Sequence, residues 1–346
     1  MKIFNYILIV AIVLVLGLIV FTKHKPYQII KGKTMGTYYN VKIRTDNEDN
    51  LLNNDILKVL DSVVNKMSMF DSNSEISKIN NNTTGDWIEV SPELAEVLKK
   101  SDDVYKKSNG GFDPTVGKLV NLWGFGTSKT AKIPDQAEIK EVLKYTGFNK
   151  LKFSNDYTKI KKTDPQIYID LSAIAKGYGV DKVAELLISK GYEDFVVEIG
   201  GEVRAQGMKS SDKSWIIGVM RPLKGKFENE YVLKLNNYSV ATSGDYRNYY
   251  DVDGNTFSHT INSRTGYPIK NNVASVTVFR KSCMEADALA TAIISMDPEK
   301  AIAFANERGI ITILFVRKSD DNFKIMMSEK AKTYIAQNEL KQVQKE

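Results

Sequence analysis

The chain has 346 residues, of which 42% are hydrophobic and 10% aromatic, so it is long and apolar enough to bury the core of one large domain or of two closely packed ones. Its formal charge of +6 is spread along the chain without a dense run of lysine and arginine, which argues against nucleic-acid binding. The single cysteine, Cys283, excludes an internal disulfide and a cysteine-cluster metal site.

The N-terminus predicts a membrane segment. Residues 3–22 carry no charge and are nearly all apolar, which suits a membrane-spanning helix of about 20 residues. No small-residue cleavage site precedes Lys23, so residues 1–22 are expected to form an uncleaved anchor in preference to a removed signal. Lysines flank the run on both sides, and by themselves they would place the body in the cytoplasm. Residues 23–32 are expected to be a tether, with the folded body starting near Lys33.

The first half of the body is predicted to be mainly helical. A strand is expected over residues 38–44, followed by an amphipathic helix over 50–69. Residues 71–82 predict a loop with a short helical turn. Ser91 as cap and Pro92 at the first position open another helix, which the glycines after Asn109 end. A loop through residues 112–126, a helix over 134–143 and a hairpin over 151–160 complete this half.

Residues 170–181 are the stretch around which the chain is organised. An apolar strand, residues 167–169, runs through a turn of small residues into a helix that Gly191 ends. The stretch carries a carboxylate, a hydroxyl and an ammonium, and a helix N-terminus favours anions, so it is suited to part of a phosphorylated ligand. Many ordinary strand-to-helix turns have the same composition, so this pattern alone leaves both readings open.

The second half is richer in strands, which are expected over residues 195–199, 215–220, 231–235, 239–242, 256–261, 273–279 and 310–316. Ser282 and Glu285 predict a capping box for a helix over 282–296, and Asp297 opens another that Gly309 ends. Early helices and late strands without alternation predict an α+β fold. We expect antiparallel-rich mixed sheets flanked by helices, in one large domain of two intimate halves over residues 33–335, with a polar tail over 336–346.

Two groups of polar residues could carry chemistry. Asp287 and Thr291 are four apart on a helix of small apolar residues, so they share a face. An aspartate there needs a partner: either a hydrogen bond to backbone or to Lys176, or a hard cation such as Mg²⁺ or Ca²⁺. His259 lies on a predicted strand, where a structural histidine is the ordinary reading, yet a turn-rich loop follows it and suits a general base. The glycine turn within residues 198–202 predicts either a close backbone approach to a ligand or a hairpin bend.

Together these residues resemble the ApbE-type flavin transferases, the FAD:protein FMN transferases. The resemblance rests on ordered motifs that are weak singly and specific together. They are residues 35–37 (MGT), 67–68 (MS) with 74–80 (SEISKIN), 111–117 (GFDPTVG), 170–181 (DLSAIAKGYGVD), 198–201 (EIGG), 259–262 (HTIN), 265–268 (TGYP) and 287–292 (DALATA).

The resemblance implies an enzyme that splits the pyrophosphate of FAD, passes FMN to a threonine hydroxyl of a flavoprotein and releases AMP, with Mg²⁺ as the metal. His259 would take the proton of the incoming threonine. The metal would sit between the carbonyl of Ala173 and the side chains of Asp287 and Thr291. By motif position the residues expected to contact FAD are Met35, Phe70, Gly111, Phe112, Asp113, Asp170 and Lys176, with the segment near Ile261 closing over it.

Two features depart from the family pattern. Phe70 stands where relatives often have tyrosine, which keeps a stacking face and loses a hydroxyl. No cysteine follows the apolar run to carry a lipid, so the uncleaved helix seen in the sequence replaces the lipid anchor. The family places the body outside the cytoplasmic membrane, against the lysine count. It also implies an acceptor subunit of a membrane electron-transport complex, such as a sodium-pumping NADH:quinone reductase. The alternatives are a flavin-binding or scavenging protein and a Mg²⁺-dependent FAD pyrophosphatase.

Overall fold

The computed structural model describes residues 27–127, 133–223, 225–244, 249–252, 255–319 and 321–340, with backbone only at 251–252 and 255–256. The expected membrane anchor over residues 1–22 lies outside these ranges, as does the end of the polar tail. Among the residues that the structure describes, no helix is long and apolar enough to cross a membrane.

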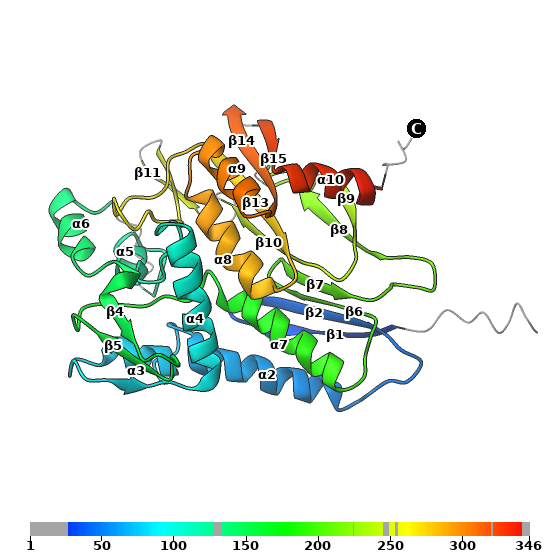
Figure 1. Cartoon of the computed structure of the whole chain (residues 1–346), viewed down its shortest axis with the longest axis horizontal. Coiled ribbons are helices and arrows are strands. Elements are labelled where there is room, and N and C mark those ends of the chain that lie inside the picture. Colours follow the sequence, from blue (N-terminus) through cyan, green and yellow to red (C-terminus); the bar gives the residue numbers. More distant parts are fainter. Residues whose placement is uncertain are drawn as a thin grey trace, which may run out of the picture.

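An eight-stranded sheet forms the centre of the molecule (Figure 1). All of its neighbouring strands pair antiparallel. In spatial order the strands are β1 (Tyr27–Thr34), β2 (Thr37–Arg44), β6 (Phe195–Ile199), β7 (Glu202–Gln206), β10 (Ser239–Gly244), β13 (Val273–Arg280), β14 (Ile311–Ser319) and β15 (Asn322–Met327). This confirms the predicted α+β class with antiparallel-rich sheets.

Helices cover one face of the sheet. They are α2 (Leu52–Met67), α7 (Ala175–Ser189) and α8 (Cys283–Ile294), and α4 (Pro92–Lys107) packs against α2 and α8. α7 packs between α2 and α8, as Figure 1 shows. The opposite face packs against a hairpin of β8 (Trp215–Met220) and β9 (Asn229–Leu235) and against α10 (Glu329–Asn338). β13 is therefore buried on both faces, and its residues 273–279 are all buried, including Ser275 and Thr277.

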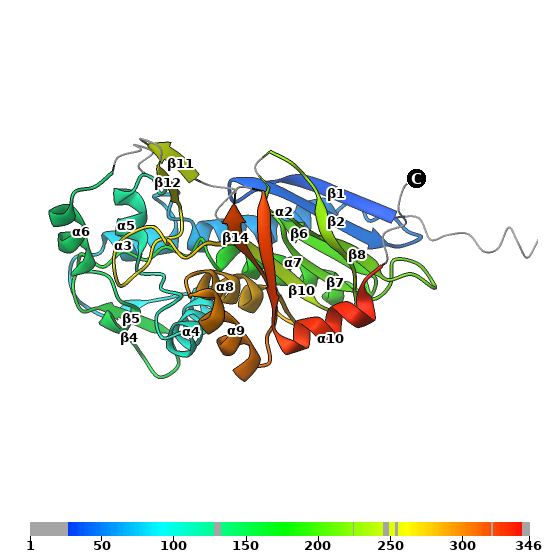
Figure 2. The ribbon, with the colours of Figure 1, turned by 90° about the horizontal axis from the view of Figure 1, so that it is seen from above.

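A second group of elements lies beside the sheet and its helices (Figure 2). It contains α3 (Glu75–Asn81), α5 (Gly117–Leu122), α6 (Gln136–Leu143), and a small sheet of β3 (Ile88–Glu89), β5 (Lys159–Lys162) and β4 (Leu151–Phe153). The hairpin of β11 (Tyr249–Val252) and β12 (Asn255–Ser258) lies there as well. α9 (Pro298–Glu307) connects α8 to β14.

Local signals predicted several helix starts correctly. The Ser91 hydroxyl accepts from the Leu94 N–H, and the Ser282 hydroxyl accepts from the Glu285 N–H. The second half of the predicted capping box is replaced, because the Glu285 carboxylate lies 3.5 Å from Arg280 Nε. Asp135 forms a complete capping box with Glu138 at the start of α6.

Other expectations need correction. β1 occupies residues 27–34, most of the segment expected to be a tether. It is an edge strand whose lysines stay partly exposed, so its sequence lacks the pattern of a buried strand. α5 lies where a loop was expected, and α10 runs three residues into the expected tail, to Asn338. Residues 167–169 form only an isolated bridge, between Tyr168 and Val116, and β12 ends at Ser258, before His259.

Candidate active site

The N-terminus of α7 meets α8 at Asp287. The backbone N–H of Gly177 donates to Asp287 Oδ2 at 3.0 Å, and Asp287 is only 3% exposed. A Cβ atom at Gly177 would overlap the carbonyl oxygen of Cys283 and lie 2.8 Å from Cβ of Asp287. Only glycine therefore allows the two helices to approach this closely.

This hydrogen bond alters the first turn of α7. In a regular helix the Gly177 N–H would donate to the carbonyl four residues earlier, which belongs to Ala173. The following residue keeps that pattern, since the Tyr178 N–H donates to the Ile174 carbonyl at 3.1 Å. The Gly177 N–H is directed to Asp287 instead. The Ala173 carbonyl thus lacks its usual helical partner and is available to another one.

Lys176 lies between two carboxylates. Its Nζ is 3.3 Å from Glu202 Oε1 and 3.6 Å from Asp287 Oδ2. Desolvation lowers the pKa of Lys176, but the charges of Asp287 and Glu202 outweigh it, so the pKa is raised and the ammonium stays protonated. Burial raises the pKa of the Glu202 carboxyl, and the nearby Lys176 opposes that shift. The Lys176 side chain remains 28% exposed, so it can contact a ligand while it is paired.

Asp287 was expected either to accept a hydrogen bond or to bind a cation. The hydrogen-bond reading is confirmed, because Asp287 accepts from the Gly177 backbone and pairs with Lys176. The cation reading stays a prediction. Among the described residues these partners all approach Oδ2, and Thr291 follows one turn later with its hydroxyl 3.3 Å from that of Ser243. The Ala173 carbonyl, the Asp287 carboxylate and the Thr291 hydroxyl are oxygen ligands of the kind that Mg²⁺ prefers.

The loop of residues 111–117 lies between α8 and the strand-like segment before α7. A Cβ atom at Gly111 would lie 2.9 Å from Ser295 Oγ and 3.1 Å from the Ala292 carbonyl oxygen, so Gly111 abuts the last turns of α8. At the other end of the loop, the Asp170 N–H donates to the Pro114 carbonyl at 2.7 Å. The predicted residues Gly111 and Asp170 are therefore held at the two ends of this loop, Gly111 against the end of α8 and Asp170 just before α7.

Phe112 and Asp113 have mainly structural surroundings. Phe112 is buried in the core. Asp113 Oδ1 accepts from the N–H and the hydroxyl of Thr115 at 2.8 and 2.6 Å, and Oδ2 accepts from the Phe148 N–H at 3.3 Å. Burial raises the pKa of Asp113, which these hydrogen bonds oppose. Asp113 shapes the loop, so any contact of this pair with a ligand would have to come from the loop backbone.

Asp170 is held by neighbours that sequence reasoning did not single out. Its Oδ1 accepts from the Ser172 N–H at 2.8 Å, and burial raises its pKa. The Asn80 side chain clamps the preceding residue, donating to the Ile169 carbonyl at 2.9 Å and accepting from the Ile169 N–H at 2.7 Å. The only sequence signal for Asn80 was its place at the end of the motif over residues 74–80.

Met35 and Phe70 come from two surface turns. Met35 and Gly36 form the two-residue turn between β1 and β2, both with positive φ (48° and 71°), as a type I′ hairpin turn requires. The Met35 side chain reaches α7, where a Cβ atom at Gly179 would lie 2.8 Å from Met35 Cε. Phe70 follows α2 and is 60% exposed. An aromatic ring this exposed suits stacking with a ligand.

The segment that follows His259 is hydrogen-bonded to the residue before the loop of residues 111–117. The Ser263 hydroxyl donates to the Gly110 carbonyl at 3.0 Å, next to Gly111. His259 itself is half-buried, with its ring centroid 6.4 Å from that of Phe125. Ile261 is buried in an aromatic cluster that includes Trp123, whose indole N–H donates to the Gly266 carbonyl at 2.8 Å. The tertiary structure therefore joins the segment that follows His259 and Ile261 to the residue before Gly111.

The turn between β6 and β7 is a hairpin bend, as one reading of residues 198–202 predicted. Ile199 pairs with Glu202 across Gly200 and Gly201, which have φ of 62° and 107°. The bend places Glu202 beside Lys176. Sequence reasoning treated Glu202 only as the end of a glycine turn, because its partner lies on another element.

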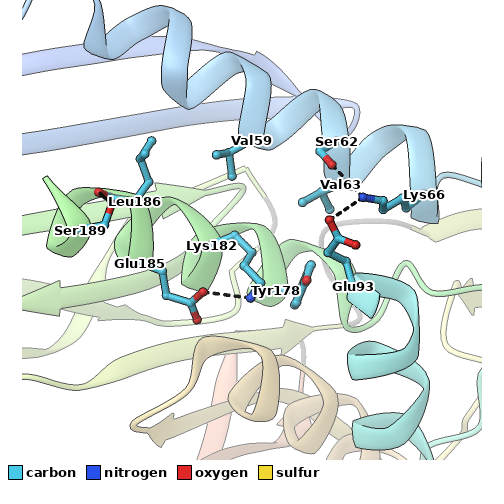
Figure 3. Close-up of a pocket in the computed structure, with 10 residues that line it drawn as sticks. All are labelled: Val59, Ser62, Val63, Lys66, Glu93, Tyr178, Lys182, Glu185, Leu186 and Ser189. Atoms are coloured by element: carbon cyan, nitrogen blue, oxygen red, sulfur yellow. Dashed lines mark hydrogen bonds and ion pairs between the residues drawn. The ribbon is translucent and has the colours of Figure 1, made fainter. Parts of the chain in front are cut away.

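A cavity of about 360 Å³ lies elsewhere, between α2 and α7 (Figure 3). Its cations are already paired, Lys66 with Glu93 at 2.6 Å and Lys182 with Glu185 at 2.9 Å. None of the predicted site residues lines it. The cavity is therefore separate from the site around Asp287.

The chain is similar to known proteins over almost all of its body. The profile of the ApbE family matches residues 35–315. A FAD:protein FMN transferase of Vibrio cholerae is 38% identical over 311 residues, covering 89% of this chain and 92% of that protein. Its Escherichia coli counterpart is 32% identical over 312 residues and covers 89% of each.

Solved structures agree with the sequence matches. The flavin transferase ApbE from Vibrio cholerae superposes with a TM-score of 0.82 at 37% identity, covering 89% of this chain and all of that one. An ApbE protein from Thermotoga maritima gives a TM-score of 0.81 at 31% identity, covering 89% of this chain and 99% of that one.

Proposed function

Because the chain belongs to the ApbE family and is a transferase, we propose that it moves the FMN moiety of FAD to a threonine hydroxyl of a flavoprotein, with Mg²⁺ as cofactor and AMP as the second product. The coarser activity, FAD:protein FMN transfer, is the one that its relatives' names carry. Metal, acceptor residue and second product are our additions.

The redirected Gly177 N–H is the observation that carries the metal proposal. Because the Gly177 N–H donates to Asp287, the carbonyl of Ala173, four residues earlier, loses its usual helical hydrogen bond. We assign the metal to the Ala173 carbonyl oxygen, the Asp287 carboxylate and the Thr291 hydroxyl. When bound there, Mg²⁺ would neutralise charge on the pyrophosphate of FAD.

The chain's own residues would prepare the phosphoryl transfer. Lys176, held protonated by Glu202 and Asp287, would add positive charge near the pyrophosphate. Phe70 would stack on a ring of FAD, and the backbone of the Gly111 loop would border the ligand. His259 would accept the proton of the attacking threonine hydroxyl, because a half-buried imidazole can be neutral and basic near pH 7.

The wider setting rests on the family resemblance. We propose that residues 1–22 anchor the protein and that the catalytic body lies outside the cytoplasmic membrane. The acceptor would be a flavoprotein subunit of a membrane electron-transport complex. Protease accessibility of the body in intact cells, compared with lysed cells, tests this orientation, and a body protected until lysis would contradict it.

Intact-mass spectrometry of an acceptor subunit tests the proposed activity. The protein is incubated with FAD, Mg²⁺ and the subunit, and the mass of the subunit is followed. A gain equal to the FMN group supports the transferase, and substitution of the modified threonine by valine should abolish it. Free FMN and AMP with an unmodified subunit would mean a pyrophosphatase, and unchanged FAD would mean a flavin-binding protein.

A further inference from the structure

Asp181, on the first half of α7, is a buried carboxylate with three partners, on β7 and at the start of α8. It is 6% exposed. Its Oδ1 lies 2.8 Å from Arg204 Nη1 on β7. Its Oδ2 accepts from the Ser282 hydroxyl at 2.7 Å and from the Met284 N–H at 3.0 Å. Both carboxylate oxygens are therefore engaged by the sheet and by the start of α8.

The contact with α8 is made at the helix cap. Ser282 is the N-cap residue of α8, and its hydroxyl accepts from the Glu285 N–H at 3.2 Å while it donates to Asp181. Asp181 also satisfies the Met284 N–H, one of the first amides of α8 that have no partner inside the helix. The Asp181 carboxylate thus fixes the N-terminal cap of α8 to α7.

The same two helices are joined a second time at the proposed metal site. Gly177 and Asp181 are one turn apart on α7, and their partners on α8 are Asp287 at one point and Met284 with Ser282 at the other. Two contacts fix both the sliding and the rotation of one helix against the other. The close approach of the two helices requires glycine at position 177, because a Cβ atom there would overlap the Cys283 carbonyl.

We propose that Asp181 is a positioning residue of the metal site. It sets the register of α8 against α7, and with it the position of the Asp287 carboxylate and the Thr291 hydroxyl relative to the Ala173 carbonyl. The inference rests on the proposed function of that site. Mg²⁺ demands near-ideal octahedral geometry, so a small shift of α8 would weaken metal binding before it unfolds the protein.

Asp181→Asn tests this role with little change of shape. Its amide nitrogen cannot accept from Ser282 or Met284, and in the flipped orientation it would face the donor of Arg204. We expect the variant to bind Mg²⁺ about 10- to 100-fold more weakly in calorimetric titrations with saturating FAD and no acceptor, the usual effect of removing a group that orients a metal ligand. At saturating Mg²⁺ its rate of FMN transfer should stay within a few-fold of the wild type.

Asp102→Asn is the matched control. Asp102 lies on α4 and is 8% exposed. Its Oδ2 accepts from the Tyr157 hydroxyl and from Lys106 Nζ, at 2.5 Å each. It should lose a similar amount of thermal stability without any change in Mg²⁺ affinity. If the two variants show the same Mg²⁺ affinity, the positioning role is wrong.

A gentler variant covers the case in which Asp181→Asn does not fold. Ser282→Ala removes one of the three bonds to Asp181, and we expect several-fold weaker Mg²⁺ binding in a folded protein. If Asp181→Asn cannot be purified and Ser282→Ala binds Mg²⁺ with wild-type affinity, the proposal is overturned. The failures are distinguishable, because a wild-type protein that binds no Mg²⁺ contradicts the proposed function, whereas binding that is indifferent to Asp181 contradicts only this inference.

Discussion

Gly177 donates its backbone N–H to Asp287 Oδ2 at 3.0 Å, across 110 residues of sequence. The bond joins two helices and removes the helical partner of the Ala173 carbonyl. The Asp287 carboxylate is thereby held against the first turn of α7.

Gly177→Ala should destabilise the protein. The new methyl group would overlap the Cys283 carbonyl, which is backbone and cannot move aside, so we expect a loss of about 1–3 kcal/mol in the free energy of unfolding, together with weaker Mg²⁺ binding. Urea unfolding measures the first effect. Gly179→Ala is the matched control, because its methyl group meets mainly the flexible end of Met35. Equal stability of the two variants would contradict the steric argument.

Phe70→Ala should weaken FAD binding without affecting stability. The ring is 60% exposed, so unfolding should change by less than about 0.5 kcal/mol. Loss of a stacking partner should raise the KM for FAD about tenfold, while Phe70→Tyr should keep the wild-type KM. A wild-type KM for Phe70→Ala would exclude the ring as a ligand contact.

His259→Ala should slow the chemical step. A general base contributes about 100- to 10,000-fold to a rate, so kcat should fall by that order while FAD binding, followed by flavin fluorescence, stays unchanged. If the variant transferred FMN at the wild-type rate, the proton-acceptor role of His259 would have to be abandoned.

Lys162 should make the free energy of unfolding increase with pH in the alkaline range. Its buried ammonium donates to the carbonyls of Asn80 and Pro165 at 2.8 and 2.9 Å, and the charge of Asp164 only partly offsets the cost of burial. Desolvation, with a smaller contribution from the charge of Lys118, lowers its pKa to about 8. Below that pH the folded state must hold a buried charge, whereas between about 8 and the unfolded value of 10.5 only the unfolded state binds the proton. Stability contributed by this group therefore increases with pH across that window.

Lys162→Met should remove that rise. Urea unfolding measures the free energy of unfolding of both proteins at pH 7.5 and at pH 10. Between these pH values the wild type should gain at most about 3 kcal/mol of stability relative to the variant. Lys159→Met, at a partly exposed position on the same strand, should leave the wild-type pH dependence intact. A pH dependence of Lys162→Met equal to that of the wild type would contradict burial as the cause.

Local sequence determined much of the architecture. Apolar periodicity predicted α2 and α7, serine caps predicted α4 and α8, and the Asp287–Thr291 spacing placed two polar groups on one helix face. These features are decided within one or two turns of chain, so neighbouring residues suffice to read them. The edge strand β1 was missed because its stability comes from pairing with β2, with half of its surface left polar.

The tertiary structure alone decided how the site is assembled. The pairing of Lys176 with Glu202, the hold of Asp181 on the cap of α8 and the release of the Ala173 carbonyl all depend on contacts between elements far apart in sequence. The side chain of Ala173 is only a methyl group, so the sequence gives no sign that its backbone oxygen could bind a ligand. That oxygen lacks its helical partner because the Gly177 N–H points to Asp287. The sequence by itself determined which groups are present, and the packing of α7 against α8 decided which of them meet.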